Sequence, residues 1–368
     1  MNDSLRAKLL LNACGAPSTA WEALKQSDSS DALWTEGEEL WKRLGIRTSS
    51  RVRLAELVAE RDWADRELER VDRFGARFVA IDDVEYPVRL KDLASPPTGL
   101  YVRGELNLQN PMTAIVGTRR CSPYGRTVAG SIGRMVARAG HQVVSGGAKG
   151  IDGAGHQGCL EEGGTTVAVL GTAVDRVYPA EHRPLFHRIA ERGALISEYP
   201  MGTGGDPWRF PERNRLIVAL CSRLVVVESP EDGGSMITAR LGLDLGREIW
   251  SVPGRITEEI CRGSNALIRD GANPLIDVDD FVEKMSGRYG QMLLDFTGDV
   301  SSPDFTGSEK NVLELLRRRG GRTLDDIMEE SGLGFVDAQS CLMTLCASGA
   351  VYSSGPGRYS AGSGDLQF

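Results

Sequence analysis

Three short segments combine cations with glycines or aromatic rings, residue types that can hold a chain of phosphates. The first, GTRRCSPYG at 117–125, carries two adjacent arginines. The second, SGGAKGIDGAG at 145–155, places Lys149 among glycines that allow a backbone to approach an anion closely. In the third, WRFPERNR at 208–215, guanidinium groups alternate with rings that can stack on unpaired bases, at about 1–3 kcal/mol per base. Together they favour a single-stranded nucleic acid as the ligand.

Each segment also has a plainer interpretation. Arg119 and Arg120 could be solvated surface arginines, and the glycines around Lys149 could form only a flexible connection, which would leave the lysine itself unexplained. Arg213 and Arg215 could pair with buried carboxylates and brace their loop. The candidate DNA-binding residues are those whose charge, ring or backbone can reach a nucleic acid: Arg119, Arg120, Ser145, Gly146, Gly147, Lys149, Arg209, Phe210, Arg213, Asn214 and Arg215.

The sequence lacks the motifs of the common nucleotide and catalytic sites. The turn after the first predicted strand, at 117–125, lacks the G-x-G-x-x-G pattern of dinucleotide-binding turns, and no G-x-x-x-x-G-K-[ST] for nucleoside triphosphates occurs in the sequence, so we expect no cofactor. The four histidines show no ligand spacing, and no nucleophile elbow is present. We therefore expect no metal site, no catalytic residues and no enzymatic activity.

Cysteine usage, the N-terminus and the net charge limit the location and the mode of binding. Seven cysteines are scattered without C-x-x-C spacing, which is typical of a reducing compartment. The start of the chain lacks a signal peptide, and no apolar run reaches the ~18 residues of a membrane span, so we expect a cytoplasmic protein. The net charge of -8 does not support nucleic-acid binding, but salt screens charges beyond about 8 Å, so local clusters of cations decide.

Strand and helix patterns alternate through the middle of the chain. Apolar runs such as LVVV at 224–227 are hydrophobic on both faces, as in a parallel sheet covered by helices. The predicted strands are 113–116, 142–145, 166–170, 194–197, 224–227 and 249–252. The fold class is therefore α/β, an extended Rossmann-like, doubly wound and mostly parallel sheet.

Smaller units are predicted on both sides of this sheet. Residues 1–75 have the pattern of a small helical domain, SAM-like or helix-hairpin-helix-like, whose first helix pair either offers amides to phosphate or packs in the ordinary way. The predicted domains are 1–75, helical; 76–287, the Rossmann-like DNA-binding domain; 288–307, a linker; and 308–368, a winged-helix-like domain with three helices before a hairpin.

The successive motifs resemble those of the DprA/Smf family of DNA-processing proteins. The likeness rests on AIVGTR at 114–119, SGGAKGIDGAGHQGCL at 145–160, the stretch from 193 to 229 that contains RFPERNR, GGSMITAR at 233–240, and VPG with RGSNALIRDGA at 252–272. The resemblance implies a Rossmann-like domain that binds single-stranded DNA, forms a homodimer and helps to load the RecA recombinase during natural transformation.

Position by position, the resemblance places DNA contacts on Arg119 and Lys149, with Arg213–Arg215 in support. One feature departs from the pattern of a DNA-reading winged helix. The helix predicted at 336–348, where a reading helix would lie, contains Asp337 and no lysine or arginine. We expect this domain to serve protein contacts or weak backbone binding rather than base readout.

Two other functions remain open at this point. The loop at 233–240 vaguely resembles the Gly-Gly-x-Gly-Thr-x-x-Glu loop of lysine-decarboxylase-like nucleotide-processing hydrolases, but Arg240 or a neighbour stands where the glutamate is expected. Alternatively, the protein is an interaction scaffold with a vestigial DNA site, which its acidic balance slightly favours.

Overall fold

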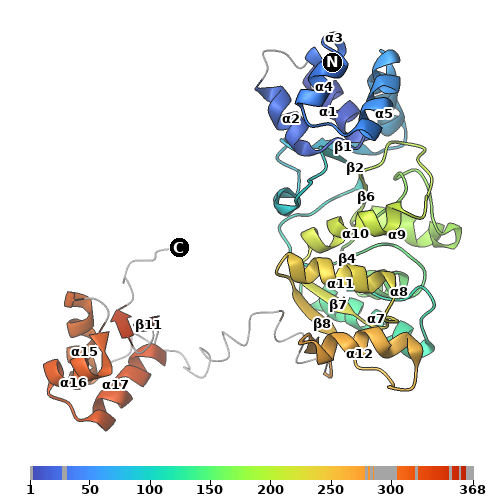
Figure 1. Ribbon diagram of the computed structural model, residues 1–368. Helices are drawn as coiled ribbons and strands as arrows, with labels where there is room; N and C mark the ends of the chain where they lie inside the picture. The colour runs from blue at the N-terminus through green and yellow to red at the C-terminus, as the bar shows by residue number, and fades with distance from the viewer. Residues whose placement is uncertain are drawn as a thin grey trace. The chain divides into compact units, whose positions relative to one another are not determined.

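The computed structural model describes residues 3–26, 31–277, 281, 285, 305–319, 322–347, 350–355 and 358–361. The chain forms two compact units, residues 1–282 and residues 283–368 (Figure 1). Within the described ranges, no helix is both long and apolar enough to cross a membrane.

A nine-stranded sheet in the order β1-β2-β6-β5-β4-β3-β7-β8-β9 forms the centre of the first unit. Its strands are β1 Arg77–Ala80, β2 Gly99–Gly104, β3 Met112–Val116, β4 Gln142–Ser145, β5 Thr166–Val169, β6 Ala194–Ser197, β7 Arg223–Val226, β8 Glu248–Ser251 and β9 Asn273–Pro274. From β6 to β9 all neighbours are parallel, and β2 pairs antiparallel with both β1 and β6. The predicted α/β, mostly parallel class is confirmed.

All six predicted strands are present, each within one residue of its predicted bounds. Three strands, β1, β2 and β9, were not predicted from the sequence. β1 and β2 pair antiparallel and lie outside the strand–helix alternation on which the prediction rested. β9 has only two residues, too few for a period to be visible.

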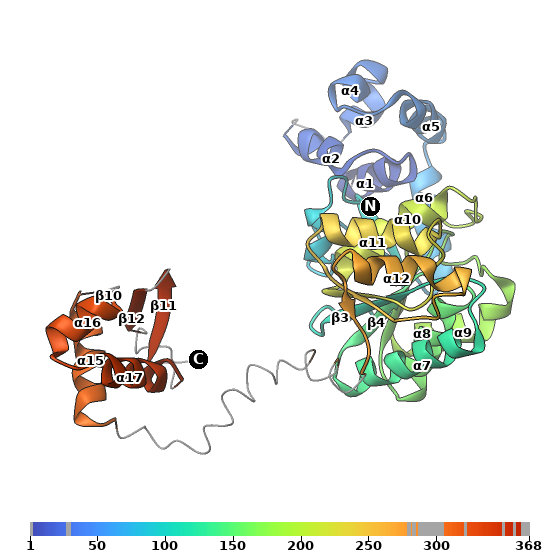
Figure 2. The same cartoon turned by 60° about the horizontal axis from the view of Figure 1, so that its bottom comes forward.

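Helices cover both faces of the sheet, as the doubly wound class requires. The helices α7 Pro123–Arg138, α8 Ile151–Glu161 and α9 Arg183–Arg192 pack together on one face. The helices α10 Arg209–Leu220, α11 Gly234–Asp244 and α12 Arg262–Arg269 lie on the other (Figure 2). Right-handed crossovers explain this, because the chain winds from β3 toward β6 and then returns past β3 to β7.

Glycines allow α7 and α8 to pack with their backbones nearly in contact. A Cβ added to Gly158 would lie 2.0 Å from the Gly130 carbonyl oxygen, and one added to Gly133 would lie 2.2 Å from that of Gly155. No side chain fits between the two helices there. The close packing fixes the turns that begin α7 and α8 relative to each other.

The N-terminal helices gather at the β1–β2 end of the sheet (Figure 1). They are α1 Asp3–Ala13, α2 Ser18–Lys25, α3 Ala32–Thr35, α4 Glu38–Arg43, α5 Thr48–Ala59 and α6 Trp63–Arg73. Leu9, Val71 and Tyr101 share one buried cluster, so these helices belong to the same compact unit as the sheet. The separate domain proposed for residues 1–75 stays a prediction.

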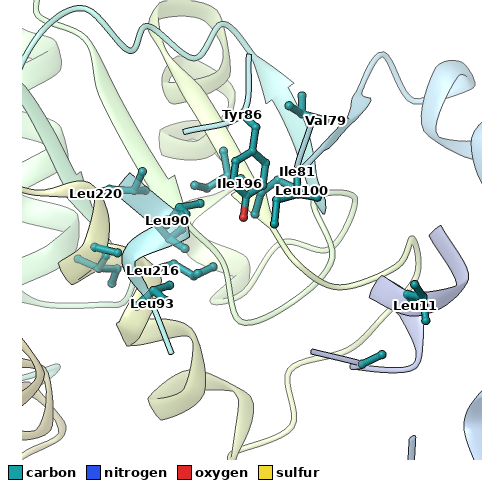
Figure 3. Packing of buried hydrophobic residues seen from close by; sticks show 14 of the residues in the cluster. Leu11, Val79, Ile81, Tyr86, Leu90, Leu93, Leu100, Ile196, Leu216 and Leu220 are labelled. Atoms are coloured by element: carbon teal, nitrogen blue, oxygen red, sulfur yellow. The ribbon is translucent and has the colours of Figure 1, made fainter. Parts of the chain in front are cut away.

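A short helical turn, η1 Val88–Asp92, packs against α10. Figure 3 shows Leu90 and Leu93 directed at Leu216 and Leu220 of that helix. All four side chains are at most 8% exposed. This apolar contact holds α10, which begins with the predicted RFPERNR segment, against the sheet.

In the residues that the structure describes, the second unit contains three helices and a small sheet in the order β10-β12-β11. Its elements are α15 Gly307–Arg319, β10 Arg322–Thr323, α16 Leu324–Ser331, α17 Phe335–Ala347, β11 Val351–Gly355 and β12 Arg358–Ala361. Val312, Leu316, Ile327 and Leu345 form its core. This is the predicted order of three helices and a hairpin; residues 288–304 of the predicted linker lie outside the described residues.

The α7–α8 contact yields a stability prediction with a matched control. Gly158→Ala should lower the free energy of unfolding by about 1–3 kcal/mol, because the new methyl group overpacks the helix contact. Gly130→Ala should be neutral or stabilising by up to about 1 kcal/mol, since its Cβ would meet nothing closer than 3.7 Å and alanine favours helix. Urea unfolding measures both; equal effects would contradict this account of the packing.

His156 of α8 is fully buried, and burial lowers its pKa to about 3. Its Nδ1 lies 2.7 Å from the Thr166 Oγ1, which donates its own proton to the Val143 carbonyl and so accepts from the imidazole. Among the described residues, Nε2 has no hydrogen-bond partner. A proton added there would create an unpaired charge in the core.

Because His156 is buried, the free energy of unfolding depends on pH. The folded pKa of about 3 lies below the ordinary value of 6.5, so the unfolded chain binds the extra proton between these values. The buried neutral imidazole therefore costs no stability above about pH 6.5. As the pH falls from there toward 3, the free energy of unfolding decreases by about 1.4 kcal/mol per pH unit. In urea titrations at several pH values, the advantage of the wild type over His156→Asn should shrink in acid. Parallel profiles would refute the assignment.

Candidate nucleic-acid interface

The turns after β3 and β4 meet at the carboxyl edge of the sheet. Pairing of Ala114 with Val144 and of Val144 with Val167 ends β3, β4 and β5 at nearly the same level. A Cβ on Gly150 would lie 2.4 Å from the Thr118 carbonyl oxygen, so the two turns are in backbone contact. The two cation-bearing turns identified in the sequence therefore lie side by side, as expected for turns that follow neighbouring parallel strands.

Arg119 and Lys149 line one cleft of about 60 Å³ at this edge, and both are exposed. The cleft is lined by Arg119, Gly146, Ala148, Lys149, Tyr178, Pro179, Phe210 and Arg213. The structure thus brings together cations from two βα turns with a ring from α10. Lys149 and Arg119 do not lie on opposite sides of the molecule.

Aromatic rings form one wall of the cleft. The Arg119 guanidinium lies 5.0 Å from the centre of the Phe210 ring, and the Tyr178 ring lies 5.2 Å from Phe210 on centres. Gly171 leaves room for Phe210, since a Cβ there would approach the ring to 2.8 Å. Tyr178 is 49% exposed and was missed by the sequence analysis; its signal was a tyrosine in the segment that follows the third predicted strand.

Arg209, next to Phe210 in the sequence, lies between two further aromatic rings. The Arg209 guanidinium lies 4.9 Å from the rings of both Tyr199 and Trp208. It also pairs with Asp206 at 3.1 Å and donates to the Gly204 carbonyl at 3.0 Å. Trp208 is 58% exposed. Arg209 is therefore committed to its loop, whereas the tryptophan ring is open to a base.

Arg213 is buried and braces the glycine-rich turn. Its guanidinium donates to the Gly146 carbonyl at 2.7 Å. The Asp152 carboxylate accepts from the amides of Gly146 at 3.1 Å and Ala148 at 3.4 Å. Burial lowers the pKa of Arg213 to about 10 and raises that of Asp152, and each charge opposes the shift of the other. The amides of Gly146 and Ala148 thus serve an internal carboxylate.

Other predicted residues also hold the framework. Ser145 is buried and donates its hydroxyl to the Ile115 carbonyl at 2.6 Å. Arg215 is ion-paired with Glu198 and donates to the Ser95 carbonyl. Arg213 and Arg215 therefore brace the structure internally, as the plainer interpretation of their segment proposed. Any DNA contact by Ser145, Arg213 or Arg215 stays a prediction.

The three remaining predicted residues differ in accessibility. Gly147 is buried, with a φ of +67° that favours glycine. Asn214 is half-buried near the start of α10. Arg120 is exposed beside Arg119 and forms no ion pair within the described residues. Of these three, Arg120 is the best placed to meet an external anion.

Glu228 occupies the anion position at the start of α7. Its carboxylate accepts from the Ser122 amide at 2.9 Å and from the Ser122 hydroxyl at 2.5 Å. A Cβ on Gly125 would fall 2.3 Å from this carboxylate. In a dinucleotide-binding Rossmann domain, this helix end holds a pyrophosphate. Here a phosphate at the turn must rely on the arginine side chains instead.

Lys149 forms an ion pair with Glu181 at 2.7 Å across the rim of the cleft. The lysine hydrogen bond lowers the pKa of Glu181. Both side chains are more than half exposed, so solvent screens the pair and leaves it weak. A phosphate can therefore replace the glutamate at little cost.

Fold and site together define a class: a Rossmann-like protein with a cationic, aromatic cleft in place of a nucleotide site. Residues 77–286 match the family described as DNA recombination-mediator protein A. The chain belongs to this family, the DprA family of DNA-processing proteins.

Individual relatives support this assignment. A Mycobacterium tuberculosis protein named for DNA processing (DprA) is 38% identical over 289 residues, covering 74% of each chain. The X-ray structure of DprA from Streptococcus pneumoniae superposes with a TM-score of 0.67 at 28% identity, covering 77% of this chain and 98% of that one. DNA processing protein A from Helicobacter pylori, whose structure is described for its single-stranded DNA binding mode, gives 0.52 at 28% identity and covers 57% and 95%.

Proposed function

We propose that this protein binds single-stranded DNA in the cleft lined by Arg119, Lys149, Tyr178 and Phe210. The observation that carries the proposal is the convergence of two exposed cations and two rings in one hollow at the carboxyl edge of the sheet. The Helicobacter pylori relative, whose structure concerns single-stranded DNA binding, supports the same ligand class.

The side chains of the cleft suit a strand of any sequence. Guanidinium and ammonium groups attract phosphates, which every nucleotide carries, and the rings stack on bases whose faces are exposed only in single strands. Both kinds of contact are available from every nucleotide, whatever its base. Binding therefore has little sequence preference.

Family membership supports further parts of the proposal. We infer that the protein helps to load the RecA recombinase during natural transformation and recombination, and that it acts as a homodimer in the cytoplasm. It makes or breaks no bond in this role and uses no cofactor. The hydrolase alternative is disfavoured because Arg240, exposed on α11, stands where that chemistry needs a carboxylate.

Titration of a fluorescent single-stranded oligonucleotide at several salt concentrations tests the proposal. The logarithm of the affinity should fall with the logarithm of salt, by about 0.7 for each phosphate contact. Lys149→Ala should weaken binding and flatten this slope by about 0.7, because one contact is lost. Lys42→Ala, which removes an exposed lysine paired with Glu39 at 2.7 Å on α4, is the matched control and should change nothing.

Absence of binding at low salt would reject the proposal and favour the scaffold alternative. Binding with an unchanged slope in Lys149→Ala would reject this cleft as the site while keeping DNA as the ligand.

Removal of the carboxylate that pairs with Lys149 should have the opposite effect on affinity from removal of Lys149 itself. Glu181→Gln should raise the affinity for single-stranded DNA roughly 1.5- to 5-fold at low salt, because Lys149 no longer has to give up the Glu181 carboxylate when it binds a phosphate. The gain should shrink as salt increases. Glu39→Gln, which removes the nearer carboxylate partner of Lys42 and leaves Glu38 at 3.7 Å, serves as the control. Equal or weaker binding by Glu181→Gln would show that the glutamate does not compete with phosphate.

A further inference from the structure

A larger hollow of about 560 Å³ lies on the face of the domain covered by α7, α8 and α9. It adjoins the cleft at one point. Gly150 and Glu181 line the hollow, whereas Lys149, which follows Ala148 in the same turn and bonds Glu181, lines the cleft. We call this hollow the helix groove. A DNA strand that leaves the cleft past Lys149 enters it directly.

Glycines of two helices form part of the wall of the helix groove. Gly130 of α7 and Gly153 and Gly158 of α8 line it, and a Cβ added to Gly130 would make only ordinary van der Waals contact, with the Ala154 carbonyl oxygen at 3.7 Å. A continuous polymer can lie along such a surface. The lining contains no phenylalanine, tyrosine or tryptophan, and its one aromatic ring is the His182 imidazole.

Three arginines line the helix groove, and two of them keep an uncompensated charge. Arg134 is paired with Glu161 at 3.0 Å. Arg188 donates to the Gln157 side-chain oxygen at 3.0 Å, which is neutral and leaves the positive charge in place. Arg126 is exposed and has no ion-pair or side-chain hydrogen-bond partner within the described part of the chain. Glu181, the other acid of the lining, is engaged by Lys149.

We propose that the helix groove continues the DNA path beyond the cleft, with Arg126 and Arg188 holding the phosphates of nucleotides that leave it past Lys149. This inference rests on the proposed function. The guanidinium groups hold the phosphates, and His182 is the one aromatic ring of the lining on which a base could stack. The groove therefore adds affinity and salt dependence for longer strands without adding base preference.

The test compares oligothymidines of increasing length on the full chain. In the double variant Arg126→Ala/Arg188→Ala, the shortest oligomers that bind the cleft should keep wild-type affinity. Long oligomers should bind more weakly, and their salt slope should fall by about 1.4, the loss of two contacts at about 0.7 each. The length at which affinity stops increasing should be shorter than in the wild type.

Arg138→Ala/Arg192→Ala is the matched control, because it removes one exposed arginine from each of α7 and α9 outside the helix groove. It should behave as the wild type with all lengths. Thermal unfolding of both double variants confirms that neither has lost its fold.

The outcomes separate this inference from the proposed function. Long oligomers that bind the groove variant as tightly as the wild type, with Lys149→Ala still impaired, would overturn the groove and keep the cleft. An equal loss for short and long oligomers would also overturn it, since the arginines would then act within the cleft. If the variant lost only binding of thymidine monophosphate, the groove would be a site for free nucleotide and the inference would again fail.

Discussion

Two buried carboxylates hold the carboxyl edge of this sheet in shape. Asp152 accepts from the amides of Gly146 and Ala148, and Glu228 accepts from the amide and hydroxyl of Ser122. The Ser122 amide lies at the first turn of the domain, where Rossmann domains hold pyrophosphate. Because the protein supplies its own anions, the turns are ordered without a nucleotide. An external phosphate is then left to the side chains that project beyond the turns.

The cleft follows from that arrangement. Arg119 projects from a turn fixed by Glu228, and Lys149 from a turn fixed by Asp152, so neither cation depends on a ligand for its position. Phe210 lies against Arg119 and lines the same cleft as Lys149, because α10 is held by the apolar contact with η1 (Figure 3). Placing the charges and rings in advance reduces the entropy lost when a flexible strand binds.

Sequence patterns located much of this design. The buried parallel strands were found because each is a short apolar run followed by a turn. Arg119, Lys149 and Phe210 were predicted because their residue types fit a polyanion with exposed bases, and the structure places all three around one cleft. The partners that decide each residue's use could not be found in the same way. Glu228 is 106 residues from Ser122, and Glu181 is 32 from Lys149. Only the fold shows that Arg213 points inward while Arg119 points outward.

The net charge of -8 restricts how such a site can work. A protein with this balance gains little from long-range attraction to DNA, since charges more than about 8 Å apart are screened at physiological salt. Affinity must come from short-range contacts, and rings such as Phe210 and Tyr178 contribute there without regard to net charge. A duplex hides its base faces and offers mainly phosphates, so it gains only the electrostatic part. The acidic balance thus favours single strands over duplexes, because the contacts that remain strong are those that only unpaired bases can make.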